Sequence, residues 1–250
     1  MKIIKGKTPA SWVICIYGVP GIGKSTLATR AEKPVFLDVE GGLDRIDCER
    51  TPRLRTWNEL FEAMKWASES EYKTVVFDTL LAIEELIIQK IIDEINEDRN
   101  PSYQVKTLRD QDKSLAYGAG FEILKSKWSQ FAKMLYVIKD MGKNVVCIAH
   151  DAVEKVENPS GENYDRYSLN IHKKSVPLVV SKMDAVFFAH FEKTIRSKKN
   201  SEKKVAQDTG SRIIQTVEKP WCVAKNRFDL PEHISFTSAE DARKFFGTIK

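Results

Sequence analysis

The sequence lacks the features that mark secreted, zinc-binding and membrane-spanning proteins. Its 250 residues include four cysteines that form no CxxC pair, which predicts reduced thiols in a cytosol and no zinc site. The longest apolar runs, such as Trp12–Tyr17, have six residues, whereas a membrane helix needs roughly 20. The opening MKIIKGK faintly resembles a signal peptide, yet no small-residue cleavage pattern follows it. We therefore expect a cytoplasmic protein with no membrane partner.

The sequence also carries little net charge. Lys+Arg 40 and Asp+Glu 35 leave a formal net charge of +5, which permits an anionic partner without requiring one. Apolar residues make up 42% and aromatic residues 10%, enough to build a packed core and to exclude wholesale disorder. No convincing linker divides the chain. We expect one domain over residues 1–250, with a core at 11–231 and a C-terminal extension at 232–250.

Short apolar runs alternate with longer amphipathic stretches, which predicts an α/β fold with a mostly parallel sheet flanked by helices. Three helical stripes are clear: one follows the N-cap candidate Thr56, one starts at Leu80, and one runs from Phe121 to Ile138 and stops before Gly142. The apolar runs suit strands that are buried on both faces. The predicted strands are Trp12–Tyr17, Val35–Val39, Thr74–Asp78, Asn144–Ala149, Asp184–Ala189, Ile213–Thr216 and Trp221–Ala224.

Three stretches lack any periodicity and are predicted to be long loops. They cover residues 96–118, 151–166 and 193–210, and the last is predicted to form a basic hairpin between late, antiparallel strands. Loops of this length in a compact domain are often functional.

A glycine-rich motif follows the first predicted strand. Residues 18–25 read GVPGIGKS, which fits GxxxxGK[ST], and Leu27–Arg30 then opens a helix. The glycines let backbone N–H groups turn toward phosphate oxygens, and the helix adds the positive end of its dipole. Lys24 would neutralise the β- and γ-phosphates. The motif predicts a site for ATP and Mg²⁺ that is built from Gly18, Val19, Pro20, Gly21, Ile22, Gly23, Lys24, Ser25 and Thr26.

A second acidic element is expected beside this loop. The run TVVFD at 74–78 predicts a buried strand that ends in Asp78 at the carboxyl edge of the sheet. Asp78 would hold Mg²⁺ through water, together with the Ser25 hydroxyl, and Thr79 could help to position that water. On its own, an apolar run that ends in Asp also fits a strand followed by a helix N-cap.

Glu40 lies just past the end of another predicted strand, in the segment VFLDVEGGLD at 35–44. The carboxyl ends of parallel strands share one edge of a sheet, so Glu40 is placed to polarise an attacking water. The alternative interpretation is an acid on a surface loop.

These elements together resemble the RecA-like P-loop ATPase core. That family carries an acid-x-Glu pattern whose Glu is the catalytic base, and Glu40 matches it. The segment VVCIAH at 145–150 resembles the strand whose last polar residue senses the γ-phosphate; the family often has Gln there, and His150 departs from it while still able to donate a hydrogen bond. The stretch VVSKMDAV at 179–186 resembles the passage after the second DNA-binding loop.

The segment VAKNRFDLP at 223–231 resembles the family's Lys-x-Lys or Lys-x-Arg element, here Lys225 and Arg227. In family members these cations reach the ATP of a neighbouring subunit, which implies a homo-oligomer with ATP at its interfaces. The resemblance therefore implies Glu40, Lys24, His150, Lys225 and Arg227 as catalytic residues. The alternatives are a core histidine for His150 and a basic strand end for the two cations.

The resemblance covers residues 12–231 and is closest to the small phage ATPases that act as single-strand annealing proteins, also called phage nucleotide-binding or AAA-type ATP-binding proteins. It implies an ATPase whose hydrolysis is stimulated by DNA. Such a protein would bind single-stranded DNA and promote annealing and homologous recombination in the host cytoplasm. A single-stranded-DNA-binding protein is a further candidate partner. Because about ten residues precede the first strand, we expect annealing rather than filament-based strand exchange.

By the same resemblance, DNA would contact loops 96–118 and 151–174. The first offers cations and aromatic rings that suit single strands, namely Arg99, Tyr103, Lys106, Arg109, Lys113 and Tyr117. The second offers Tyr164, Arg166, Tyr167, His172, Lys173 and Lys174. It also holds acids that oppose phosphate, namely Asp151, Glu154, Glu157, Glu162 and Asp165. The cleanest basic patch is the hairpin at 193–204, which includes Lys193, Arg196, Lys198, Lys199, Lys203 and Lys204. A charge run of this kind is more often a solvated loop.

Three other functions stay open. A small-molecule kinase could use 96–118 as a lid, but it would leave Lys225 and Arg227 unexplained. A helicase-loader or motor-like AAA protein would carry a helical lid domain. A nucleotide-gated binding module would show negligible turnover. ATPase assays with and without single-stranded DNA separate the DNA-annealing ATPase from the kinase and from the binding module.

Overall fold

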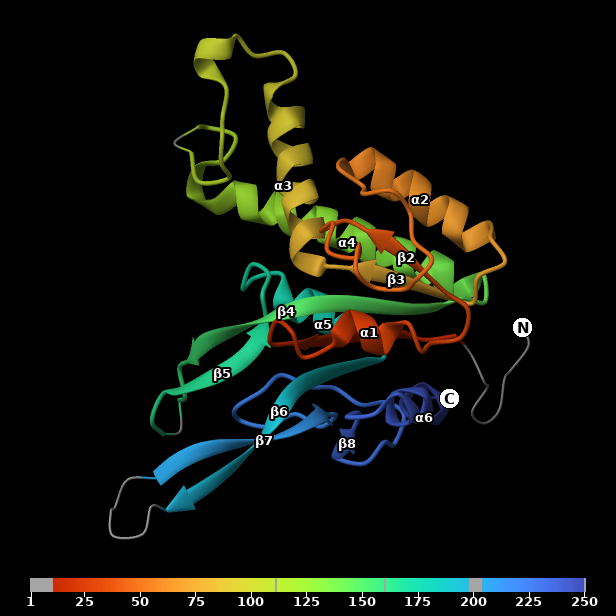
Figure 1. Cartoon of the computed structure of the whole chain (residues 1–250). Coiled ribbons are helices and arrows are strands. Elements are labelled where there is room, and N and C mark those ends of the chain that lie inside the picture. The colour runs from red at the N-terminus through yellow and green to blue at the C-terminus, as the bar shows by residue number, and fades with distance from the viewer. Residues whose placement is uncertain (1–10, 111, 160, 198–203, 250) are drawn as a thin grey trace, which may run out of the picture.

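The computed structural model describes residues 11–249 except 111, 160 and 198–203, and within this set it leaves out the side chains of 193–209. One central sheet has the strand order β2-β3-β4-β1-β6-β7-β8, and β5 pairs with β4 (Figure 1). The strands β2, β3, β4, β1 and β6 are parallel, and β5, β7 and β8 are antiparallel to their neighbours. Their bounds are β1 Val13–Gly18, β2 Pro34–Asp38, β3 Thr74–Asp78, β4 Asn144–Val156, β5 Tyr164–Leu169, β6 Ala185–Ser197, β7 Lys204–Gln215 and β8 His233–Ser235.

This architecture confirms the predicted mostly parallel sheet with late antiparallel strands. The helices are α1 Lys24–Ala28, α2 Trp57–Glu69, α3 Leu80–Asn96, α4 Ala119–Asp140, α5 Val176–Lys182 and α6 Ala239–Thr248, with short 3-10 turns at Pro101–Tyr103 and Ala116–Gly118. Thr56 caps α2 as predicted, because its Oγ1 accepts the backbone N–H of Glu59 at 3.2 Å.

Each face of the sheet has its own core and its own helices. Along β1, Val13, Cys15 and Tyr17 pack with residues of α2, α3, α4 and α5. The alternate residues Ile14 and Ile16 pack with α1 and α6 on the other face. The two-residue period of a strand explains why this continuous apolar run is buried on both sides. In Figure 1, α2 and α3 lie above β4, and α6 lies beside β8.

Several predicted boundaries are wrong. The helix after the glycine-rich motif is Lys24–Ala28, so it begins before the predicted Leu27–Arg30 segment and ends halfway through it. Residues 221–224 form no strand and take part only in isolated bridges, such as Tyr167 with Cys222. The β4 strand runs past its predicted end to Val156 and pairs with β5, so residues 151–166 contain a hairpin rather than a loop. Both faces of this ribbon are largely accessible, so its strands carry no apolar alternation for the sequence to reveal.

The last residues pack into the same core. Prediction from sequence missed β8, which pairs with β7, and α6, whose Phe245 is fully buried against the β1 face. A signal for α6 was present: Ser238 and Asp241 form a capping box ahead of an apolar stripe. Over the part of the chain that the structure describes, no helix combines the length and apolar character needed to cross a bilayer.

Candidate functional site

The phosphate loop connects the end of β1 to α1 at the carboxyl edge of the sheet. Its first glycine, Gly18, lies so close to β6 that a Cβ there would stand 2.0 Å from the carbonyl oxygen of Ala189. Gly23 has φ 97, a left-handed conformation that side chains rarely adopt. Both positions therefore need glycine for backbone reasons, and the curled loop they permit is the form in which backbone N–H groups can face phosphate oxygens.

The side chains of Lys24 and Ser25 turn into this edge. Lys24 is buried, and its Nζ donates to the carbonyl oxygens of Gly18 and Val19 at 2.7 and 3.0 Å. Burial lowers the pKa of Lys24, while the charges of Asp151, Asp78 and Glu40 act in the opposite direction. The lysine is thus held inside the loop, where a polyphosphate would supply the countercharge that its surroundings only partly provide.

Asp78 ends β3 and meets the phosphate loop across β4. Its Oδ2 accepts the hydroxyl of Ser25 at 2.6 Å. Burial raises the pKa of Asp78 to about 6; the hydrogen bond from Ser25 lowers it, and the nearby carboxylates of Glu40 and Asp38 raise it further. A carboxylate that is costly to ionise in this site, next to a hydroxyl ligand, is a position where a divalent cation would be stabilising.

Glu40 follows β2 and is tied to the end of β3. Its backbone N–H donates to the Asp78 carbonyl oxygen at 3.1 Å, and Asp38 fixes the next residue by accepting the Gly41 N–H at 2.7 Å. The Glu40 carboxylate then reaches the imidazole of His150, with Oε1 and Nε2 3.2 Å apart. Glu40 and His150 therefore face each other at the mouth of the phosphate site.

Strand order explains why these residues meet. β4 lies between β1 and β3, so Gly18 is in register with His150 and Ile148 with Asp78. A cavity of about 310 Å³ opens at this edge. Eight of the predicted site residues line it: Gly21, Gly23, Lys24, Ser25, Thr26, Glu40, Asp78 and His150. The other lining residues are Gly42, Ile46, Thr79 and Ile148.

The remaining predicted loop residues do not line the cavity. The side chain of Ile22 is fully buried in the core, and Val19 packs against the same cluster. Gly18 and Pro20 complete the turn. Their contribution to a nucleotide site would come from the backbone rather than from side chains.

The donors present fit an Mg²⁺–nucleotide. Among the described side chains, the buried Thr79 Oγ1 and His150 Nδ1 have no hydrogen-bond partner, and both residues line the cavity. Nothing lies within 4 Å of a Cβ built on Gly21, so the loop is open on that side. Among the described residues no cluster of three His, Cys, Asp or Glu side chains forms a cage for an ion. Mg²⁺ needs none when a carboxylate, a hydroxyl, waters and substrate phosphates supply its six ligands.

Sequence reasoning missed two acids of this site. Asp38 shapes the turn that carries Glu40, and Asp151 has the largest charge interaction with Lys24. Asp151 had been counted only as an acid opposed to DNA. The available signal was its position one residue after His150. A residue next to one that lies at the phosphate edge of the sheet lies near that edge as well.

Lys225 and Arg227 lie at the opposite edge of the sheet. Arg227 Nη1 is 3.6 Å from Asp184 Oδ1, and Asp184 stands beside the start of β1, whereas the phosphate loop follows its end. Lys225 Nζ donates to the last carbonyls of α5, at Val180, Ser181 and Met183, over 2.6 to 3.1 Å. Neither cation can reach the phosphate site of its own subunit, and Lys225 is already engaged as a helix cap.

The two predicted DNA loops come together beside α4. Phe121 stacks on His172 with ring centroids 4.3 Å apart. Arg109 and Lys174 flank the Phe121 ring, at 6.0 and 5.9 Å from its centroid. Tyr117, four residues earlier, is fully exposed. We call Arg109, Tyr117, Phe121, His172 and Lys174 the ring-and-cation cluster. It draws on both 96–118 and 151–174, the two loops that the resemblance implies for DNA.

Other predicted DNA residues are engaged within the chain. Arg99 is held by Asp112 at 2.6 Å, and this pairing holds the pKa of that carboxyl well below its usual range. Arg166 pairs with Glu154 at 2.8 Å. For the basic hairpin, the structure gives the antiparallel pairing of β6 with β7, while residues 198–203 and the side chains of 193–209 lie outside what is described.

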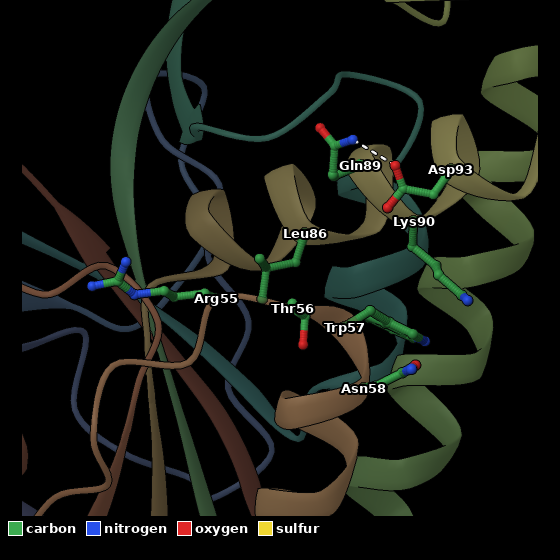
Figure 2. A pocket seen from close by; sticks show the side chains of 8 residues that line it. All are labelled: Arg55, Thr56, Trp57, Asn58, Leu86, Gln89, Lys90 and Asp93. Carbon is green, nitrogen blue, oxygen red and sulfur yellow. Dashed lines mark hydrogen bonds between the residues drawn. The ribbon is translucent and has the colours of Figure 1, made fainter. Parts of the chain in front are cut away.

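A separate cavity of about 210 Å³ lies where α2 meets α3 (Figure 2). Trp57 and Leu86 form its apolar part, and on α3 Gln89 donates to Asp93, one turn away, at 2.7 Å. None of the residues predicted for the nucleotide site lines it.

The fold and this site define a P-loop nucleotide-binding protein of the α/β class. A family model described as "AAA domain" matches residues 10–228, and the chain belongs to that family. Membership implies nucleotide binding, usually with Mg²⁺, and nucleotide hydrolysis in general terms. The chain is also similar to the SPbeta prophage-derived uncharacterized protein YorG of Bacillus subtilis (strain 168), at 25% identity over 149 residues. That match covers 57% of this chain and 42% of the relative's length.

Proposed function

We propose that this protein is an ATPase of phage origin that binds single-stranded DNA and promotes the annealing of complementary strands. The observation that carries the DNA part is the ring-and-cation cluster. Exposed or stacked rings with flanking cations suit single strands, because every base has a face to stack and every nucleotide has a phosphate. The YorG likeness supports the phage origin.

The position of the cluster supports a link between DNA and ATP. Asn170 donates its backbone N–H to the His150 carbonyl oxygen at 2.9 Å, and His172 follows two residues later. The backbone N–H of His172 donates to the buried carboxylate of Glu84 at 2.7 Å. A short, hydrogen-bonded segment therefore runs from the phosphate site to the stacked ring of His172. DNA bound at the cluster would contact the segment that is hydrogen-bonded to His150. We therefore expect DNA to stimulate hydrolysis.

Two substitutions test the DNA site without touching the core. Tyr117→Ala and Lys174→Ala change exposed side chains, and Lys65→Ala on the exposed face of α2 removes the same charge elsewhere as the matched control. Loss of one stacked base contact costs roughly 1–3 kcal/mol. Loss of one phosphate contact lowers the salt slope of single-strand binding by about 0.7.

The readouts are anisotropy of a labelled oligothymidine across a salt series, DNA-stimulated phosphate release, and the annealing rate of complementary oligonucleotides. We expect Tyr117→Ala and Lys174→Ala to weaken all three, with Lys65→Ala matching the wild type. Equal DNA binding by all four proteins would remove the cluster from the proposal, and no DNA binding by any of them would remove the function.

A specific observation favours a second candidate, a small-molecule kinase. A cavity of about 290 Å³ adjoins the site, and Glu40 lines it together with Arg53, Arg55 and Glu85. Such a pocket could present an acceptor hydroxyl to Glu40 in place of water. A kinase would release little phosphate without an acceptor and would not respond to DNA, so phosphate release with and without oligothymidine separates the two functions.

A further inference from the structure

An arginine from a late strand stands beside the phosphate loop. Arg212 lies on β7, and among the described side chains no carboxylate pairs with its guanidinium and no acceptor takes a hydrogen bond from it. A half-buried arginine without a countercharge is unusual, because its five donors are normally satisfied by carboxylates, carbonyls or a ligand. The position of this cation suggests what satisfies it.

The strand register places Arg212 on the face that carries the loop. Ile214 pairs with Ala189, and Ala189 pairs with Gly18, the first residue of the loop. Ile214 packs in the same cluster as Ile22 of the loop. Residues two apart on a strand share a face, so Arg212 points to the same side, beyond the end of β1.

The backbone of Arg212 is fixed on both sides. Its N–H donates to Thr237 Oγ1 at 3.0 Å, and its carbonyl oxygen accepts the N–H of Phe236 at 3.0 Å. The guanidinium then reaches Gly23, where Nη1 stands 2.9 Å from the place that a Cβ would occupy. Gly23 lines the nucleotide cavity. Glycine at this position therefore also leaves room for the arginine.

Arg212 approaches from the side of β1 opposite to the hydrolytic residues. In the sheet, β6 and β7 lie on one side of β1, whereas β4, β3 and β2, which lead to His150, Asp78 and Glu40, lie on the other. Water attack at the γ-phosphate belongs to the Glu40 side. The Arg212 side corresponds to the inner phosphates, which the loop backbone cradles in this motif.

We propose that Arg212 is a nucleotide-binding residue that contacts the α- or β-phosphate, a role separate from that of Lys24 at the β- and γ-phosphates. The proposal rests on nucleotide binding at the phosphate loop. A planar guanidinium suits phosphate because it donates two parallel hydrogen bonds and stays charged.

The test compares ATP and ADP affinity, measured by isothermal titration calorimetry with Mg²⁺, for wild type, Arg212→Ala, Arg212→Met and Arg243→Ala. Arg243 is an exposed arginine on α6 and serves as the charge-matched control, while Arg212→Met keeps an apolar stem. Thermal melts without nucleotide check that each variant folds. We expect both Arg212 variants to lose about tenfold to a hundredfold in affinity, the effect of a lost charge-assisted hydrogen bond. The loss should be the same for ATP and ADP, because both carry the inner phosphates.

Two outcomes overturn the inference while leaving nucleotide binding intact: Arg212 variants that bind both nucleotides as Arg243→Ala does, or a loss confined to ATP. If the wild type itself binds neither nucleotide, the phosphate-loop assignment fails first.

Discussion

The carboxylate of Glu40 and the imidazole of His150 lie 3.2 Å apart although 110 residues separate them in the chain. Both side chains line the phosphate cavity; Glu40 follows the end of β2, and His150 lies on β4. A base at this position can take the proton of an attacking water, and an imidazole beside it can orient the base and report on the terminal phosphate. The pair is therefore the natural centre for tests of hydrolysis.

Glu40→Gln should cut ATP hydrolysis by roughly 10²–10⁴-fold, the scale of a lost general base. Nucleotide affinity should change little, because the amide keeps the size of the side chain and Glu40 is not part of the phosphate loop. Single-turnover phosphate release and ADP titration measure the two quantities. An unimpaired rate would take the role of base away from Glu40.

His150→Gln should retain more hydrolysis than His150→Ala. Glutamine can still donate a hydrogen bond toward Glu40 and the terminal phosphate, whereas alanine leaves Glu40 without its partner. Turnover numbers at saturating ATP for the two variants give the comparison. Equal rates in both would show that the hydrogen bond from this position does not contribute.

Lys24→Ala should abolish nucleotide binding. The lysine is the buried cation of the phosphate loop, and no other described side chain occupies its place between Gly18 and Val19. Fluorescent-nucleotide titration, with a thermal melt to confirm folding, measures the effect. Retained ATP affinity would count against the phosphate-loop assignment.

Substitution of Lys225 should lower the free energy of unfolding more than substitution of Arg227. Lys225→Met removes the cap of α5 and should lower the free energy of unfolding by about 1–3 kcal/mol, because three carbonyl oxygens lose a charged donor. Arg227→Ala removes only an exposed ion pair and should cost less than about 1 kcal/mol. Urea unfolding measures both.

If Arg227 acts on the ATP of a neighbouring subunit, Arg227→Ala should slow turnover without weakening ATP binding. Mixing it with Glu40→Gln protein should then restore some activity, because a mixed interface can combine the intact Glu40 of one subunit with the intact Arg227 of the next. Absence of rescue at every ratio, with mixed assemblies shown by light scattering, would rule out action between subunits.

Glu84 offers a pH test of the segment that carries His172. One carboxylate oxygen accepts from the His172 N–H at 2.7 Å, and the other accepts from Trp128 Nε1 at 2.8 Å. In Glu84→Gln an NH₂ group would replace one of these oxygens and would face an N–H group that needs an acceptor. We expect a loss of about 1–3 kcal/mol in the free energy of unfolding. Burial raises the pKa of Glu84.

A raised pKa in the folded state means that the native protein binds the proton more tightly than the unfolded chain does. Stability contributed by Glu84 is then fully present below its unfolded pKa and falls as the pH rises through the folded value. The destabilisation by Glu84→Gln should therefore be larger near pH 4.5 than at pH 7. Urea unfolding of both proteins at the two pH values measures this difference, and a difference of opposite sign would contradict the assignment.

Much of the site was predictable because its parts are short and contiguous. The motif at 18–25 specifies its own turn, and apolar runs that end in Asp78 or just before Glu40 mark strand ends at one edge of a parallel sheet. The helix capped by Thr56 was readable for the same reason, since the cap and its partner Glu59 lie three residues apart.

Other features followed from contacts that no local pattern records. The β4–β5 hairpin has two accessible faces and so no apolar alternation. Arg99 was predicted to be available for DNA, but the loop folds back on itself and pairs this arginine with Asp112. The engagement of Lys225 with α5 depends on carbonyls more than 40 residues away in the chain.

The sequence alone was sufficient to specify a phosphate loop, an acid at or just past the end of two strands, and a mostly parallel sheet, because backbone conformation and burial pattern are set by residues close together in the chain. Tertiary structure decided which charges remain free. It paired Glu40 with His150, tied Lys225 to a helix end, brought Phe121 onto His172, and set the guanidinium of Arg212 beside Gly23. Such pairings depend on strand order and register, which bring distant residues within reach of one another.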